Sequence, residues 1–205
     1  MSDETSEARR RQIMDAVVDV TVTGGLQAAT FRTIAEAAGV SVRLVQYYFG
    51  DKDRLLTDTL SHVGAKVASR IAEDLAELGD DPPPRQVIGT IFEAFLPLDE
   101  PRQRAMLVFI AFRTAALTDR SLASSDALGL ASSLISHIEA QLQHAADLGH
   151  ARHGLKPRSE AILLIGAMTG LSNAILAGDI SVNEARVHLD YAIDRSLPGP
   201  AERVP

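Results

Sequence analysis

The stretch that decides the fold is TFRTIAEAAGVSVRLVQYYFGDK, residues 30–52. Thr30 and Ser41 each precede a short run with apolar residues at helical spacing, and hydroxyl side chains of this kind cap helix N-termini. Gly39 lies between the two runs and easily takes the left-handed conformation of a tight turn. Ala35 is small at the position where the two helices have to approach each other. The stretch therefore predicts two short helices that cross steeply, a helix-turn-helix motif.

The second helix of such a motif, residues 42–48 here, places its N-terminal side chains against the base edges of DNA. Arg43 is suited to two hydrogen bonds with guanine, and Gln46 to two with adenine. The rival interpretation is a helical corner that does not touch DNA. The predicted DNA-binding residues are Arg9, Arg10, Arg11, Arg32, Thr33, Ser41, Val42, Arg43, Gln46, Tyr47, Tyr48 and Lys52.

The arginine triplet at residues 9–11 has two interpretations. It is either a basic arm that reaches the DNA backbone or minor groove, or a solvated helix start. The overall charge argues against a global attraction to DNA, because the net charge is -7. Residues 1–60 hold seven Lys or Arg against nine Asp or Glu. Affinity would therefore depend on where the cations point and on dimerisation.

The rest of the chain has helical periodicity nearly everywhere, and no strand-like alternation is found in the sequence. We expect an all-α fold with a DNA-binding domain at residues 1–51, a helical ligand-binding and dimerisation domain at 52–198, and a flexible tail at 199–205. The predicted helices outside the motif span residues 9–23, 52–78, 86–96, 102–117, 121–148, 158–177 and 182–196.

Cysteine is absent, which suits a reducing cytoplasm, and the first residues lack the apolar segment of a signal peptide. The run AILLIGAMTGLSNAILAG, residues 161–178, is long enough to raise the question of a membrane span. Its small and polar residues favour a central buried helix instead. We expect no membrane partner and a cytoplasmic location.

The C-terminal half offers candidates for an effector pocket and a dimer interface. Arg113 follows an apolar run, so it either binds an anionic ligand, pairs with an internal carboxylate or reaches solvent. Asn173, inside the apolar run, either contacts ligand or bonds to a neighbouring helix. The predicted ligand-binding residues are Phe92, Phe95, Met106, Phe109, Phe112, Arg113 and Asn173. The predicted interface residues are Leu134, Ile138, Leu142, Gly166, Gly170 and Ala174, and tight packing within one subunit is the alternative.

Three histidines invite a metal interpretation, namely His144, His150 and His153. They lack a nearby set of acidic ligands, so surface histidines are expected and no metal or cofactor is predicted. No pattern for a catalytic triad, a phosphate loop or paired carboxylates stands out. The sequence therefore does not favour an enzyme.

Two segments carry a resemblance to a known family. Residues 11–60, with the TFRTIAEAAGVS core and the YYFGDKDRLL exit, resemble the N-terminal domain of tetracycline-repressor-family regulators. Gln46 stands where most members carry tyrosine, and Arg43 where glycine is common. LPLDEPRQRAMLVFIAFRTAAL and GAMTGLSNAILAG resemble, more weakly, the betaine- and choline-regulator subgroup. This subgroup resemblance does not transfer choline as the ligand.

The resemblance implies an all-helical homodimer that binds a palindromic double-stranded DNA operator and represses transcription until a small-molecule effector binds. The helix from Lys52 would link the sensor to the DNA reader. Two rival functions are an activator of the same family and a helical small-molecule-binding protein that no longer reads DNA. Salt-dependent binding to duplex DNA distinguishes the last from a regulator.

Overall fold

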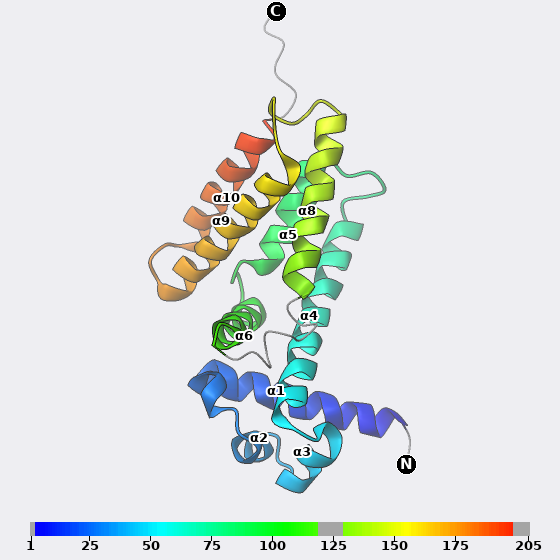
Figure 1. Ribbon diagram of the computed structural model, residues 1–205, viewed down its shortest axis with the longest axis vertical. Coiled ribbons are helices and arrows are strands. Elements are labelled where there is room, and N and C mark those ends of the chain that lie inside the picture. The colour runs from blue at the N-terminus through cyan, green and yellow to red at the C-terminus, as the bar shows by residue number, and fades with distance from the viewer. Residues whose placement is uncertain (1–2, 119–128, 199–205) are drawn as a thin grey trace, which may run out of the picture. The chain divides into compact units, whose positions relative to one another are not determined.

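The computed structural model describes residues 3–118 and 129–198, and in these ranges the chain is helical with no strand (Figure 1), as predicted. The predicted helix of residues 121–148 lies partly outside the described residues, and the predicted tail at 199–205 lies entirely outside them. The helices are α1 (Asp3–Ala28), α2 (Phe31–Ala37), α3 (Val42–Phe49), α4 (Lys52–Ala76), α5 (Pro84–Phe95), α6 (Glu100–Ala116), α8 (Gly129–Asp147), α9 (Pro157–Ala177) and α10 (Val182–Ser196).

The helix-turn-helix prediction is confirmed at its caps and at its turn. Thr30 accepts a hydrogen bond from the backbone N–H of Thr33, whose hydroxyl in turn bonds to the backbone N–H of Thr30. Ser41 accepts from the backbone N–H of Leu44. Gly39 has a φ of 63°, a conformation that costs other residues about 1–2 kcal/mol. The caps at Thr30 and Ser41 therefore define where α2 and α3 begin, and the turn at Gly39 separates the two helices.

Helix α1 begins earlier than predicted and is interrupted at the predicted glycine pair. It begins at Asp3 and runs to Ala28, with a kink at Gly25, where φ is 73°. The backbone at Gly25 is not helical, so the regular helix ends at the glycine pair as predicted, and the residues that follow form a separate helical turn. The earlier start places the arginine triplet in the body of a helix, where its side chains point to fixed sides.

The chain divides into two compact units, residues 1–66 with 104–130 and residues 67–103 with 131–205. This division cuts α4 after Lys66 and joins part of α6 to the first unit. The predicted boundary at residue 51 instead separates α4 from the motif.

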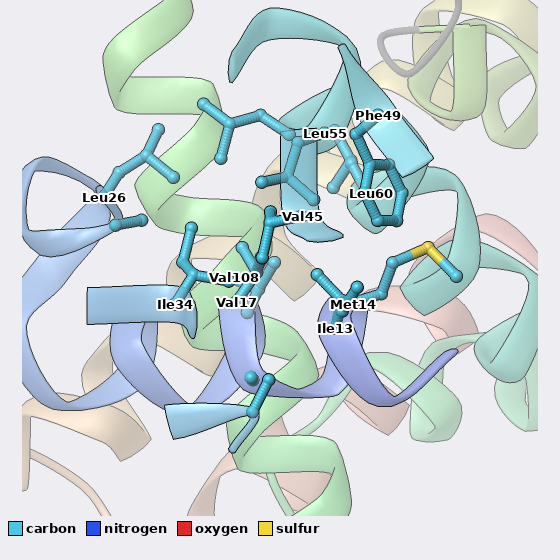
Figure 2. Close-up of a cluster of buried hydrophobic side chains, with 14 of the residues drawn as sticks. Ile13, Met14, Val17, Leu26, Ile34, Val45, Phe49, Leu55, Leu60 and Val108 are labelled. Carbon is cyan, nitrogen blue, oxygen red and sulfur yellow. The ribbon is translucent and has the colours of Figure 1, made fainter. Parts of the chain in front are cut away.

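The first unit surrounds one hydrophobic core to which α1, α2, α3, α4 and α6 all contribute. Figure 2 shows Ile13, Ile34, Val45 and Leu55, from four different helices, pointing into this core. In Figure 1, α2 and α3 lie side by side next to α1. Because the core reaches both helices of the motif, it fixes the crossing of α2 and α3.

The second unit packs α5, α8, α9 and α10 around a separate core, with α9 and α10 side by side (Figure 1). Helix α9 was expected to be a central buried helix, and the structure shows that only part of it is buried. Ala161, Leu164 and Met168 are buried, whereas Ile162 and Leu163 are exposed. By length and composition alone, α9 could cross a membrane. One apolar face of α9 therefore packs in the core of the second unit, and another apolar face is exposed.

Candidate nucleic-acid interface

Helix α3 has one face in the core and one face in solvent. Val45 and Phe49 are completely buried, so they anchor the helix to the first unit. On the other side, Val42, Arg43 and Gln46 are exposed. A short helix fixed along one side, with an arginine and an amide free on the other, is the arrangement that reads base edges in a major groove.

The aromatic run at the end of α3 is divided between the same two faces. Tyr47 is 80% exposed, Tyr48 is half-buried against the core, and Phe49 is buried. The rings of Tyr47 and Tyr48 meet edge to face, with centroids 5.3 Å apart. This contact limits the orientations of the Tyr47 ring, which lowers the conformational cost of holding it at the surface.

The cations of α3 and of the neighbouring ends of α2 and α4 have no acidic partner in the described part of the chain. Among the residues that the structure describes, no acidic side chain pairs with Arg32, Arg43, Lys52 or Arg54. Lys52 and Arg54 lie in the first turn of α4, where Asp51 caps the helix by accepting the N–H of Arg54. Free backbone N–H groups and cations at a helix start favour phosphate. Arg54 was not among the predicted DNA-binding residues, although its position two residues after Lys52 was available as a signal.

The three arginines of α1 have three different environments. Arg9 donates to Gln12 Oε1 at 2.7 Å, and Arg11 makes only an exposed pair with Glu7 at 3.5 Å. Arg10 donates to the backbone oxygen of Tyr48 at 2.8 Å and to Asp58 at 2.7 Å. The expectation of a basic arm is therefore corrected for Arg10, because its guanidinium is already bonded within the protein.

Two predicted contacts serve as helix caps. The hydroxyl of Thr33 donates to the backbone oxygen of Ala28 at 2.6 Å and belongs to the capping box of α2. Ser41 is the N-cap of α3. Both residues are exposed, so a phosphate contact by either would be additional to a bond that the fold already uses.

Acidic side chains of α1 hold α4 and α6 in the first unit. Asp15 pairs with Lys66 at 2.9 Å and with His62 at 3.2 Å, and Asp19 pairs with Arg104. Partial burial opposes ionisation of Asp15, but the hydrogen bonds and charges of Lys66 and then His62 outweigh it and lower its pKa. These negative charges are thus neutralised locally, which reduces their repulsion of DNA.

The predicted ligand-binding residues are divided between the two units. Phe92 is completely buried in the core of the second unit, and Phe95 is half-buried at its edge. Phe112 is buried in the core of the first unit. Arg113 is exposed, which is the alternative in which it reaches solvent, and Asn173, expected inside an apolar helix, is exposed as well. The remaining two lie in the first unit, namely Met106, which is buried, and Phe109, which is half-buried.

The predicted interface residues on α8 also need a correction. Ile138 and Leu142 are completely buried in the core of their own unit, and Leu134 is partly buried against it. They hold α8 to the subunit and are not available to a second copy. By contrast, Gly166 and Gly170 on α9 are exposed and Ala174 is half-buried.

An exposed apolar face, which we call the α9–α10 face, is formed by Ile162, Leu163, Val187 and Tyr191 with the two glycines of α9. A Cβ placed on either glycine would meet nothing within 4 Å, so a second helix has room to approach. The sequence identified the glycines by their spacing but missed the four large side chains. Those four residues were taken as core or left unassigned, because buried and exposed apolar residues look alike in a sequence. Among the described residues, no group of three or more His, Asp or Glu is placed to hold a metal.

Comparisons with known proteins agree with this geometry. Residues 13–59 match the family described as bacterial regulatory proteins, tetR family. Residues 84–198 match the family described as BetI-type transcriptional repressor, C-terminal. The two matches cover the reading motif and most of the helices of the second unit, and their members are regulators, not enzymes.

Relatives and solved structures extend the similarity to nearly the whole chain. The HTH-type transcriptional regulator BetI of Vibrio campbellii is 26% identical over 93% of this chain and 93% of its own. The BetI regulator of Pseudomonas paraeruginosa is 30% identical over 79% of this chain and 83% of its own.

A crystal structure of a TetR-family regulator from Rhodococcus sp. has 25% identity, covers 92% of this chain and 98% of its own, and has a TM-score of 0.78. A transcriptional regulator from Saccharomonospora viridis in complex with choline has 21% identity, covers 94% and 98%, and has a TM-score of 0.80. Regulators of the TetR family bind DNA and small-molecule effectors and act as dimers. With its N-terminal reading motif and its BetI-type C-terminal region, this chain belongs to the TetR family and is a ligand-responsive, DNA-binding transcriptional repressor.

Proposed function

We propose that the repressor acts in the cytoplasm as a homodimer on a palindromic operator, with α3 of each subunit in a major groove, and that a small-molecule effector releases it. The observation that carries the proposal is the two-sided α3, which buries Val45 and Phe49 and leaves Arg43 and Gln46 free. A buried side fixes the helix, and a free side of hydrogen-bonding groups supplies direct readout.

In this proposal, base reading and phosphate binding fall to different residues. Arg43 binds guanine, Gln46 binds adenine, and Tyr47 contacts an adjacent base or sugar. Arg32, Lys52 and Arg54 bind phosphate, because they have no acidic partner among the described residues and lie close in sequence to the ends of α2 and α3. Arg32 and Arg54 are exposed, and Lys52 is half-buried. The operator would then depend on the Arg43 and Gln46 pair, while overall affinity would depend on the cations around it.

The homodimer would form through the α9–α10 face. A two-fold interface uses the same patch on both subunits, so the patch has to be self-complementary. Ile162 and Leu163 supply apolar area, and Gly166 and Gly170 let two α9 helices approach closely. Two DNA-binding domains related by a two-fold axis require half-sites related by the same axis, which is the reason for a palindromic operator.

The test is selection of DNA sequences by the purified protein, followed by titration of the selected duplex at several salt concentrations. We expect an inverted repeat whose half-sites are about one helical turn apart. Arg43→Ala should weaken binding to this duplex and relax selection at one base pair in each half-site. If no sequence is enriched, or if the enriched sequence has no two-fold symmetry, this mode of reading is wrong.

The effector is tested by its ability to release the selected duplex. Choline is the first compound to try, because the Saccharomonospora viridis protein was solved with it. A ligand weakens DNA binding only by as much as it prefers the state that does not bind DNA. Release by choline at a concentration that also raises the thermal stability of the free protein would assign it, and unchanged binding would exclude it.

A further inference from the structure

The guanidinium of Arg10 is held by contacts within the protein, and these contacts serve no DNA phosphate or base. Its side chain extends from α1 and bonds to two other helices at once. One Nη donates to the backbone oxygen of Tyr48 in α3, and the other donates to Asp58 in α4. The guanidinium carbon also lies 4.6 Å from the centroid of the Phe49 ring. A single cation thus contacts the last turn of the recognition helix in two ways.

The Tyr48 oxygen is one of the last four carbonyls of α3, which have no partner inside the helix. Two of the others accept from backbone groups that follow, because Gly50 donates to Gln46 and Asp51 donates to Phe49. The Tyr48 oxygen receives its bond from Arg10 instead. A cation at this end also interacts favourably with the helix dipole. Arg10 therefore completes the C-terminal end of α3, as Ser41 completes its start.

A neighbouring side chain on α1 does the same for α2. Gln12 donates to the backbone oxygen of Ala38, the C-cap of α2, at 2.7 Å, and Arg9 bonds to the amide oxygen of Gln12. Arg10 and Gln12, which we call the α1 clamp, thus hold the C-terminal ends of both helices of the motif. Arg11, between them in sequence, has an exposed pair with Glu7, and among the described residues its side chain makes no hydrogen bond to α2 or α3.

We propose that Arg10 is a positioning residue for DNA reading, which acts through the Tyr48 carbonyl and Asp58 and does not contact DNA. Its two bonds fix the rotation and tilt of α3 relative to α4, which also presents Lys52 to phosphate. Base contacts require the side chains of Arg43 and Gln46 to meet base edges within a fraction of an ångström, so a small rotation of α3 weakens specific binding. Phosphate contacts tolerate such a rotation better. The inference rests on operator binding by α3.

The test compares Arg10→Gln, Arg10→Lys and Asp58→Asn with the matched control Arg11→Gln on the selected operator. Arg10→Gln and Arg10→Lys should both weaken operator binding about 5- to 150-fold, the usual range of coupling between sites. Lysine keeps the charge but cannot form the two-pronged contact. Binding to a scrambled duplex should change much less, so the ratio of specific to non-specific affinity falls. If Arg11 touches the DNA backbone, as the basic-arm interpretation expects, Arg11→Gln lowers specific and non-specific binding together, so this ratio should stay unchanged.

Asp58→Asn separates electrostatics from positioning, because the two predict opposite changes in operator affinity. Asp58→Asn removes a negative charge from the DNA-binding unit, which by electrostatics alone should tighten binding. The proposal expects weaker operator binding, because Arg10 loses its partner. The double variant Arg10→Gln with Asp58→Asn should bind no more weakly than Arg10→Gln, since both changes break the same contact. Tighter binding by Asp58→Asn, or additive losses, would overturn the proposal.

Salt dependence distinguishes the alternative that Arg10 contacts phosphate. Loss of one phosphate contact per subunit reduces the slope of log K against log salt by about 0.9 for each contact. The proposal expects the slope of Arg10→Gln to equal that of the unmodified protein. A smaller slope together with normal affinity for Arg10→Lys would show that Arg10 is a phosphate contact.

Two controls keep these outcomes interpretable. Circular dichroism at the assay temperature gives the folded fraction of each variant, and the affinities are corrected for it. A fully folded Arg10→Lys variant with normal specific binding would refute the positioning role. If the unmodified protein and Arg11→Gln both fail to bind any selected duplex, the operator proposal fails instead, and the two failures are thereby distinguished.

Discussion

Leu163→Ala should weaken the dimer more than any substitution of similar size elsewhere on the surface. Leu163 lies on α9 and is 66% exposed in the single subunit. Complete burial of a leucine side chain contributes about 1.5–3 kcal/mol, so covering the exposed part contributes about 1–2 kcal/mol in each subunit. A two-fold interface contains the residue twice, which brings the total to about 2–4 kcal/mol. Since about 1.4 kcal/mol corresponds to a factor of ten, the dimer should dissociate about 30- to 800-fold more readily.

The assay is sedimentation equilibrium over a range of protein concentrations, followed by operator titration at the same concentrations. Leu148→Ala is the matched control, because Leu148 is 50% exposed just after the end of α8 and does not belong to the α9–α10 face. Operator affinity of Leu163→Ala should recover when the protein concentration is raised, since the reading heads are intact. An unchanged dimer in Leu163→Ala, or an equal loss in Leu148→Ala, would refute the assignment of the interface.

Three further predictions concern specificity, the turn and acid stability. Gln46→Ala should reduce discrimination at one base pair by about 1–3 kcal/mol in a competition assay, and an unchanged preference would remove Gln46 from the reading residues. Gly39→Ala should lower the free energy of unfolding in urea by about 1–2 kcal/mol, because φ is 63° there, whereas Gly89→Ala in the open interior of α5 should not; equal effects would contradict the turn argument. The lowered pKa of Asp15 stabilises the folded state above the unfolded pKa, and this stabilisation is lost as pH falls through the folded pKa. Unfolding of Asp15→Asn, followed between about pH 6 and pH 2, should therefore lose less stability on acidification than unfolding of the unmodified protein, and parallel losses would show that the pairs with Lys66 and His62 contribute nothing.

The helix-turn-helix motif was predictable because its signals are local. The hydroxyls of Thr30 and Ser41 bond within three residues, and Gly39 adopts its turn conformation for reasons of its own backbone. Such short-range chemistry can be read directly from a sequence. The same holds for the end of α4 near the proline run and for α10, which spans the predicted residues 182–196.

The role of Arg10 was not predictable, because its partner Asp58 lies 48 positions away. Three adjacent arginines look alike in a sequence, and only the directions of their side chains on α1 separate them. Helix α9 shows a second limit. Apolar residues lie on all sides of this helix, so their periodicity does not distinguish the face that packs in the core from the face that stays exposed. The alternatives for Arg113 stayed open in the sequence for a similar reason, since it follows an apolar run and only the helix shows that it is exposed.

The four unpaired cations around α3 also bear on how quickly the repressor can find its operator. Non-specific binding depends almost wholly on phosphate contacts, and a genome offers roughly a million or more competing sites. A DNA-binding unit that neutralises Arg10 internally and has only Arg32, Arg43, Lys52 and Arg54 as cations between residues 30 and 54 is held weakly by each of these competing sites. More of its copies therefore remain free to sample the operator, and fewer are needed to keep the controlled gene silent.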